Sequence, residues 1–294
     1  MHFQTISHRV LAEWNKRHFF MRAVEIPGKN ICSFTLRLRS EKPNAETLYQ
    51  VISKIVGPVE WIKTRRSYWK ISEFITNVYD FGRIIYSGSR AEGLDLPGSD
   101  SDTMLVFTLL SVYPSNETLQ YSADTDLILI LDNVRPGFAL VKVHKVSPVV
   151  DVQISSVRME NGEVYLSSKL WREFFLYNCN IRHPSRFDIL YLHGPCSTMK
   201  IDGIEHDFVC HTWPDVAVEW VNRRRKNNWP PNTLVQEVVE SDCILIPVGA
   251  KQSSTENLEW RLSFSVAELK LIYSMNHIQF LCYGPLKMIL RQGH

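Results

Sequence analysis

The sequence lacks the features that mark several common classes of protein. Its six cysteines stand singly, with no Cys-x-x-Cys pair and no His/Cys set at zinc-finger spacing, so it predicts neither a disulfide framework nor a zinc finger. It has no uninterrupted apolar run of membrane-spanning length, and its first twenty residues carry charges instead of a signal core. We therefore expect a cytoplasmic protein without membrane association.

The chain also lacks a strong charge of either sign. Its 33 Lys and Arg against 31 Asp and Glu give a formal net charge of +2, which does not by itself argue for a nucleic-acid partner. Two local basic clusters are the exception, and each is either a solvated face or part of a surface for double-stranded RNA. The first comprises Lys63, Arg65, Arg66 and Lys70, and the second comprises Arg223, Arg224, Arg225 and Lys226.

What is present is a long, moderately apolar chain. The 294 residues, 45% of them hydrophobic, suffice for one large or two modest domains with a real core. Apolar residues recur at helical spacing over residues 45–79, interrupted at Gly57-Pro58, and predict a long or broken helix. Short strands follow over residues 127–131, 138–143, 149–157, 206–210 and 243–247, before a helical C-terminal stretch.

A Gly-Ser turn and two nearby aspartates are the most informative feature. Gly88-Ser89 follows an apolar run, and Asp100 and Asp102 stand just before a second one. Residues two apart on a strand face the same side, so both carboxylates would point one way. Two such charges about 4 Å apart repel by roughly 4 kcal/mol at an effective dielectric near 20, and a divalent cation relieves that repulsion. A solvated polar turn is the alternative.

A two-metal site needs a further acid from a neighbouring strand. Asp207 is the best candidate, because it lies in the apolar strand context of residues 206–209, where an unpaired buried carboxylate would be costly. Asp151, within residues 149–152, is its rival on composition alone.

Several motifs in a fixed order resemble the cyclic GMP-AMP synthase-like (cGAS-like) receptors of the male-abnormal-like (Mab-21-like) nucleotidyltransferases. They span most of the chain, and as a set they are highly specific. The matching segments are Gly88-Ser89, residues 92–94, 97–104, 136–142 and 162–169, Asp207 with Trp213-Pro214, and residues 260–265 with Glu268.

The resemblance implies a fold class, α+β: a nucleotidyltransferase fold with a central mixed β-sheet, a long N-terminal spine helix and a partial helical second lobe. It implies an N-terminal helical segment over residues 1–44, a core over 45–220, and the start of a helical C-terminal lobe over 221–294. The chain ends inside an apolar helix where family members continue, so we expect that lobe to be truncated.

The resemblance also assigns roles. It favours Asp207 over Asp151, because the family's third metal ligand precedes a Trp-Pro pair. It implies that Asp100, Asp102 and Asp207 hold Mg²⁺ or Mn²⁺ and that ATP and GTP are joined into a cyclic dinucleotide in innate immune sensing. The nucleotide-binding residues that it implies are Gly88, Ser89, Arg261, Ser263, Ser265 and Lys287.

We predict no zinc. His277 and Cys282 fall where the vertebrate DNA sensor carries a zinc insertion, but two ligands cannot close a tetrahedral site. Two other functions stay open from the sequence: a catalytically idle homologue that binds a nucleotide or a partner, and a double-stranded RNA-binding module.

Overall fold

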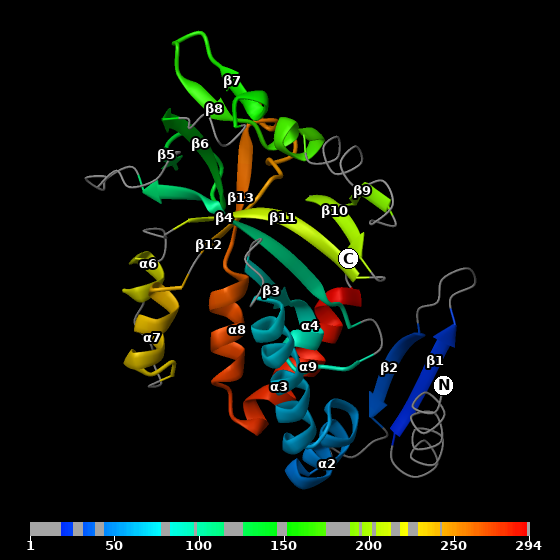
Figure 1. The fold of residues 1–294 in the computed structure, drawn as a ribbon. Helices are drawn as coiled ribbons and strands as arrows, with labels where there is room; N and C mark the ends of the chain where they lie inside the picture. The colour runs from blue at the N-terminus through cyan, green and yellow to red at the C-terminus, as the bar shows by residue number, and fades with distance from the viewer. Residues whose placement is uncertain are drawn as a thin grey trace. The chain divides into compact units, whose positions relative to one another are not determined.

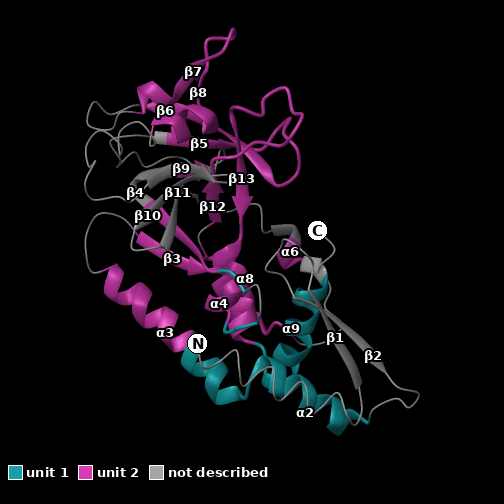
Figure 2. Ribbon diagram, turned by 90° about the vertical axis from the view of Figure 1, so that its right-hand side faces the viewer, with its two compact units in different colours: residues 1–65, 93–100, 275–294 teal, residues 66–92, 101–274 magenta. Residues whose placement is uncertain are grey.

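The protein is an α+β structure with a large mixed sheet and flanking helices (Figure 1). The computed structural model describes residues 19–25, 32–38, 44–77, 83–96, 99–114, 126–145, 152–174, 189–193, 196–201, 204–212, 218–222, 229–241 and 243–292. The chain divides into two compact units, coloured separately in Figure 2, which we describe one at a time.

The first unit comprises residues Met1–Arg65, Gly93–Asp100 and Met275–His294. It contains an antiparallel pair of strands, β1 (Phe19–Glu25) and β2 (Cys32–Leu38). The prediction of a helical segment over residues 1–44 is wrong for these two strands, where β-branched and aromatic residues are frequent. Residues 1–18 lie outside the described part of the chain.

Two helices of this unit, α2 (Ala45–Val56) and α9 (His277–Gln292), pack together. The Asn44 side chain caps α2 by accepting a hydrogen bond from the Thr47 amide at 2.8 Å. The helix ends at Gly57, whose φ of 111° suits glycine. On α9, a Cβ at Gly284 would lie 3.0 Å from a Val56 methyl, so glycine permits the close approach.

The second unit comprises residues Arg66–Glu92 and Ser101–Ser274. Helix α3 (Val59–Thr76) continues into it from the first unit, and the predicted long or broken helix is confirmed as two helices separated at Gly57-Pro58. The unit's sheet has eleven strands among the described residues. They are β3 (Arg83–Ser87), β4 (Asp102–Pro114), β5 (Asp126–Ile130), β6 (Phe138–Lys145), β7 (Ser156–Arg158), β8 (Val164–Leu166), β9 (Ile189–His193), β10 (Cys196–Ile201), β11 (Ile204–Thr212), β12 (Cys243–Ile246) and β13 (Glu259–Ser263).

The long strand β4 organises this sheet. It pairs antiparallel with β3 and parallel with both β5 and β11, so the sheet is mixed. Strand pairing then runs from β5 through β6, β13 and β12 back to β11, which closes a ring of six strands. The predicted strands over residues 127–131, 138–143, 206–210 and 243–247 are confirmed. Within the predicted strand over residues 149–157, residues 153–155 form a 3₁₀ turn, η1 (Gln153–Ser155), residues 156–157 open β7, and residues 149–151 lie outside the described part of the chain.

Two apolar clusters lie on opposite faces of the sheet. The larger one has Trp260 at its centre, whose indole N–H donates to the Leu166 carbonyl at 2.9 Å and whose ring lies 5.8 Å from that of Trp171. The smaller cluster consists of Ile85, Met104, Val106, Ile244 and Ile246. Alternation separates the two sets along β12 and β13, whereas on β4 Met104 and Val106 belong to the smaller cluster and Val112, beyond a shift in the pairing with β11, to the larger one.

Helices cover the smaller cluster. Helix α8 (Ser265–Tyr273) packs against β3 and β12, and α7 (Asn232–Val239) packs against α8, with α6 (Val218–Val221) beside α7. The short helix α4 (Gly88–Ala91) follows β3 directly. No described helix has the length and apolar character needed to cross a membrane.

Candidate functional site

The two predicted metal-binding positions of the second unit lie on neighbouring strands. Asp102 opens β4 and is exposed, and Asp207 is in β11. The parallel register pairs Asp207 with Met104, two residues beyond Asp102. Paired residues share a face of a sheet, as do residues two apart on a strand, so positions 102, 104 and 207 lie on one face. The Asp207 side chain lies outside the described part of the structure.

Two predicted nucleotide-binding residues belong to the same face. Strand β12 pairs Ile244 with Ser263 and Ile246 with Arg261. Both isoleucines belong to the Met104 cluster, so Ser263 and Arg261 lie on the face that carries position 102. Ser263 is half-buried, and Arg261 is exposed.

Ser265 connects helix α8 to this face. It is the first residue of α8, and its Oγ lies 3.9 Å from the Met104 sulfur, within reach of a weak hydrogen bond. Residues 263–265 therefore pass from the strand to the helix beside the residue that pairs with Asp207.

The Gly-Ser turn lies at the end of the strand that pairs with Asp102. Register pairs Ser87 with Asp102, and Gly88 then opens α4 with a φ of 81°, a conformation that favours glycine. Ser89 is 1% exposed, so the turn is packed against the rest of the unit. Backbone N–H groups at a turn of this kind are suited to bind phosphate oxygens.

Asp100 and Lys287 belong to the first unit. Asp100 is half-buried and follows a turn in which Ser99 Oγ accepts a hydrogen bond from the Leu96 amide at 2.9 Å. The Lys287 ammonium lies 5.6 Å from the centre of the Tyr283 ring. The predicted roles of Asp100 and Lys287 stay predictions.

Carboxylates suit Mg²⁺, a hard cation that prefers oxygen ligands. An exposed Asp102 and a second aspartate on the same face of the next strand fit that preference. Among the side chains that the structure describes, no group of three His, Cys, Asp or Glu residues is close enough to hold a metal, and that of Asp207 is not among them.

His277 forms hydrogen bonds with both of its ring nitrogens. Its Nδ1 lies 3.2 Å from the Tyr49 hydroxyl, and its Nε2 lies 3.3 Å from the Gly57 carbonyl oxygen. Both ring nitrogens are therefore used in hydrogen bonds between parts of the first unit. Cys282 is an exposed free thiol.

The first basic cluster is divided by its contacts. Arg65 donates to the carbonyls of Val56 and Gly93, and Arg66 donates to the carbonyl of Glu92. Both guanidinium groups are half-buried, so they are committed to the fold, whereas Lys63 and Lys70 are exposed. The predicted RNA surface stays a prediction, and of this cluster only Lys63 and Lys70 are fully exposed to such a partner. Residues 223–226 lie outside the described part of the chain.

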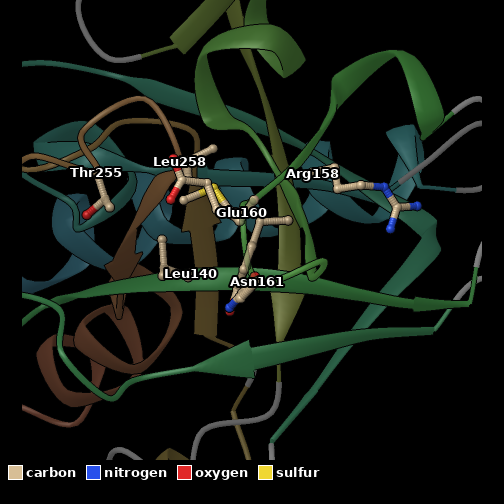
Figure 3. A pocket seen from close by; sticks show the side chains of 8 residues that line it. Leu140, Arg158, Glu160, Asn161, Thr255 and Leu258 are labelled. Carbon is tan, nitrogen blue, oxygen red and sulfur yellow. The ribbon is translucent and has the colours of Figure 1, made fainter.

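A separate surface pocket of about 480 Å³ lies beside the β7–β8 hairpin (Figure 3). Leu140, Met159 and Leu258 supply apolar lining, and Arg158 and Asn161 supply polar groups. None of the predicted site residues lines it. No sequence pattern predicts this pocket, because its walls come from segments as far apart as Leu140 and Leu258.

The first residue of β13, Glu259, is a buried carboxylate that binds the loop before the strand. Glu259 is 1% exposed and accepts hydrogen bonds from the hydroxyls of Ser253 and Thr255 and from the Ala250 amide. Burial opposes the charge, but these hydrogen bonds outweigh it and hold the pKa of Glu259 below its ordinary value. Glu259 thereby fixes the loop that leads into the strand bearing Arg261 and Ser263.

Acidic positions on adjoining strands with a Gly-Ser turn beside them suit proteins that transfer nucleotides with the help of metal ions. The model of the Mab-21 protein nucleotidyltransferase domain matches residues 118–274, over half of the chain. The protein belongs to this Mab-21 nucleotidyltransferase family. A comparison with curated proteins found no match.

Proposed function

We propose that this nucleotidyltransferase is a cyclic dinucleotide synthase that joins ATP and GTP when an activating ligand binds. The observation that carries the proposal is the common face of Asp102, position 207, Ser263 and Arg261, with the Gly-Ser turn at its end. Acidic residues and a basic residue on one face match a substrate that is both metal-bound and anionic.

The residues divide into an acidic end and a base-side end. Asp102, Asp207 and Asp100 would together hold Mg²⁺ or Mn²⁺. The metal would neutralise charge at the triphosphate and activate a ribose hydroxyl. Gly88 and Ser89 would orient the triphosphate through backbone N–H groups and the serine hydroxyl. Arg261 is exposed on its strand and would contact a base, with Ser263 and Ser265 beside it and Lys287 near the triphosphate.

The test is a turnover assay. Purified protein is incubated with Mg²⁺, labelled ATP and GTP, and candidate nucleic acids that include double-stranded RNA. We expect a cyclic dinucleotide whose rate of formation Asp102→Ala lowers by about 10³-fold or more, because the loss of a metal ligand removes electrostatic stabilisation of the transition state. Asp132→Ala is the matched control, since Asp132 is an exposed aspartate in a turn after β5.

The other outcomes separate the alternatives. ATP binding without product under any activator would identify a catalytically idle homologue. Nucleic-acid binding that falls steeply with salt, without any effect of nucleotide, would identify an RNA-binding module. Lys63→Glu is the variant for that arm, because Lys63 is exposed and pairs only loosely with Glu60 at 3.4 Å.

A cytoplasmic location and a role in innate immune sensing complete the proposal. They rest on the resemblance to the cGAS-like receptors. Recovery of the dinucleotide from the cytoplasmic fraction of cells exposed to the activating nucleic acid would support both.

A further inference from the structure

The Gly-Ser turn opens the short helix α4, and two side chains from other helices bind the backbone carbonyls at the C-terminal end of α4. Arg66, on α3, donates from Nε to the Glu92 carbonyl at 2.8 Å. Tyr273, the last residue of α8, donates its hydroxyl to the Ala91 carbonyl at 2.7 Å. Carbonyls at the end of a helix have no partner within that helix, so these two bonds satisfy groups that α4 leaves open.

The same guanidinium also caps α8. Its Nη2 lies 3.2 Å from the Ile272 carbonyl oxygen, and its Nη1 lies 3.5 Å from that of Tyr273. One side chain of α3 therefore joins the ends of α4 and α8. We call Arg66 and Tyr273 the turn clamp.

The clamp is also packed. The Arg66 guanidinium lies 4.8 Å from the centre of the Tyr273 ring, and the Lys70 ammonium lies 4.6 Å from it. Burial lowers the pKa of Arg66 and raises that of Tyr273 to about 12. The tyrosine hydroxyl therefore stays protonated and able to donate at any physiological pH.

We propose that Arg66 and Tyr273 are positioning residues that fix the Gly88–Ser89 turn for the nucleotide triphosphate. The inference rests on the proposed function, and it extends it to two residues that touch no substrate. Gly88 lies directly beyond Ser87, which pairs with Asp102, so a shift of the turn changes its place relative to the acidic end of β4.

Tyr273→Phe is the decisive variant. It keeps the ring that Arg66 and Lys70 contact and removes only the hydroxyl. Ser241→Ala is its matched control, because Ser241 Oγ also donates to a helix carbonyl, that of Glu237, at 2.7 Å, and Ser241 lies just after the end of α7, away from α4.

Two measurements apply to both variants. Hydrogen–deuterium exchange of the amides in residues 88–93 reports on the turn without any nucleotide. Steady-state kinetics and calorimetry with ATP and Mg²⁺ report on binding. We expect Tyr273→Phe to speed exchange in the turn and to raise KM and Kd for ATP about fivefold with kcat nearly unchanged, the pattern of lost binding that is equal in ground and transition states.

Arg66→Lys extends the series. Lysine keeps the charge and the contact with the ring, but it cannot donate along the three directions of the guanidinium. We expect a rise in KM of about tenfold, larger than that of Tyr273→Phe. Ser241→Ala should lower the unfolding temperature to a similar extent as Tyr273→Phe and leave KM unchanged.

Failure of this inference is distinguishable from failure of the proposed function. Normal ATP binding by the wild type, together with unchanged exchange and KM in Tyr273→Phe, would overturn the clamp alone. An equal rise of KM in Ser241→Ala would overturn it as well, since the effect would then be general loosening. A wild type that binds no ATP with Mg²⁺ would instead overturn the proposed function.

Discussion

Most surface helices bury an apolar face and expose a polar one, but helix α3 exposes apolar side chains and uses polar side chains on its inner face. One face carries Arg66, Glu73 and Asn77, and it binds the segment from Ile84 to Glu92 through polar contacts. The other carries Tyr68, Ile71, Phe74 and Ile75, which are exposed, Phe74 to 74%. On the inner face, polar side chains bind the backbone of the neighbouring segment, whereas four large apolar side chains face outward.

The contacts of the inner face follow the β3–α4 segment in order. Asn77 exchanges two hydrogen bonds with the backbone of Ile84, at 3.0 and 2.6 Å. The Trp69 ring lies 5.1 Å from that of Tyr86, and Arg66 reaches Glu92. The edge strand β3 and the turn after it present backbone groups, and polar side chains are what satisfy them.

The largest expected loss of stability comes from removing the Arg66 side chain on the inner face. Arg66→Ala leaves the half-buried carbonyls of Glu92, Ile272 and Tyr273 without this donor, so we expect the free energy of unfolding to fall by about 3 kcal/mol. Urea titration followed by tryptophan fluorescence measures it. A loss below about 0.5 kcal/mol would show that the guanidinium is as dispensable as an exposed one.

Asn77→Ala should have the next largest effect. It removes both the donor and the acceptor that serve Ile84, and we expect a loss of about 1 to 2 kcal/mol. Asn77→Asp keeps an acceptor for the Ile84 amide, but it replaces the donor with a negative charge beside the Ile84 carbonyl, so it is no substitute for the alanine variant. A loss below about 0.5 kcal/mol in Asn77→Ala would show that the two bonds to Ile84 contribute little.

A smaller effect is expected from Glu73 and depends on pH. Burial raises the pKa of Glu73 above its ordinary value, against the opposing hydrogen bond from the Tyr86 backbone. A raised pKa in the folded state gives stability that is complete below the unfolded pKa and is lost as pH rises through the folded pKa.

Glu73→Gln should therefore remove that loss. The variant's stability relative to the wild type should increase as pH rises from about 4 to 7, because the amide never ionises. Denaturation midpoints at several pH values measure the difference. A wild type whose relative stability increases over this range would contradict the assigned direction.

The smallest effect is expected on the outer face. Ile71→Ser and Phe74→Ser should each change the free energy of unfolding by no more than about 0.5 kcal/mol, because both side chains are already exposed. The comparison of the two faces would be broken if either serine variant were destabilised as much as Arg66→Ala.

The sequence predicts the elements of this fold better than their contacts. The apolar runs at residues 127–131 and 243–247 predict strands because central strands are buried. Ser167 precedes a helical run, and its Oγ accepts a hydrogen bond from the Leu170 amide at 3.2 Å, a local contact that is typical of serine at this position. By contrast, the basic residues of α3 suggest an exposed surface, and only the fold reveals that Arg66 contacts residues more than two hundred positions later.

The candidate site divides in the same way. Local motifs locate Gly88, Asp102 and Arg261, because their spacing is short and their flanking residues are distinctive. That Asp207 and Ser263 share a face with Asp102 depends on register across β4, β11, β12 and β13, which no local pattern encodes. The clamp residue Tyr273 carries no sequence signal, since its partner Ala91 is 182 positions away.

The most direct test of the central claim is calorimetric titration with ATP in the presence and absence of Mg²⁺. The account predicts that the wild type binds ATP much more tightly with Mg²⁺, that Asp102→Asn and Asp207→Asn each abolish this dependence, and that Asp132→Asn retains it. Equal affinity with and without Mg²⁺ in the wild type, or an unchanged metal dependence in Asp207→Asn, would contradict it.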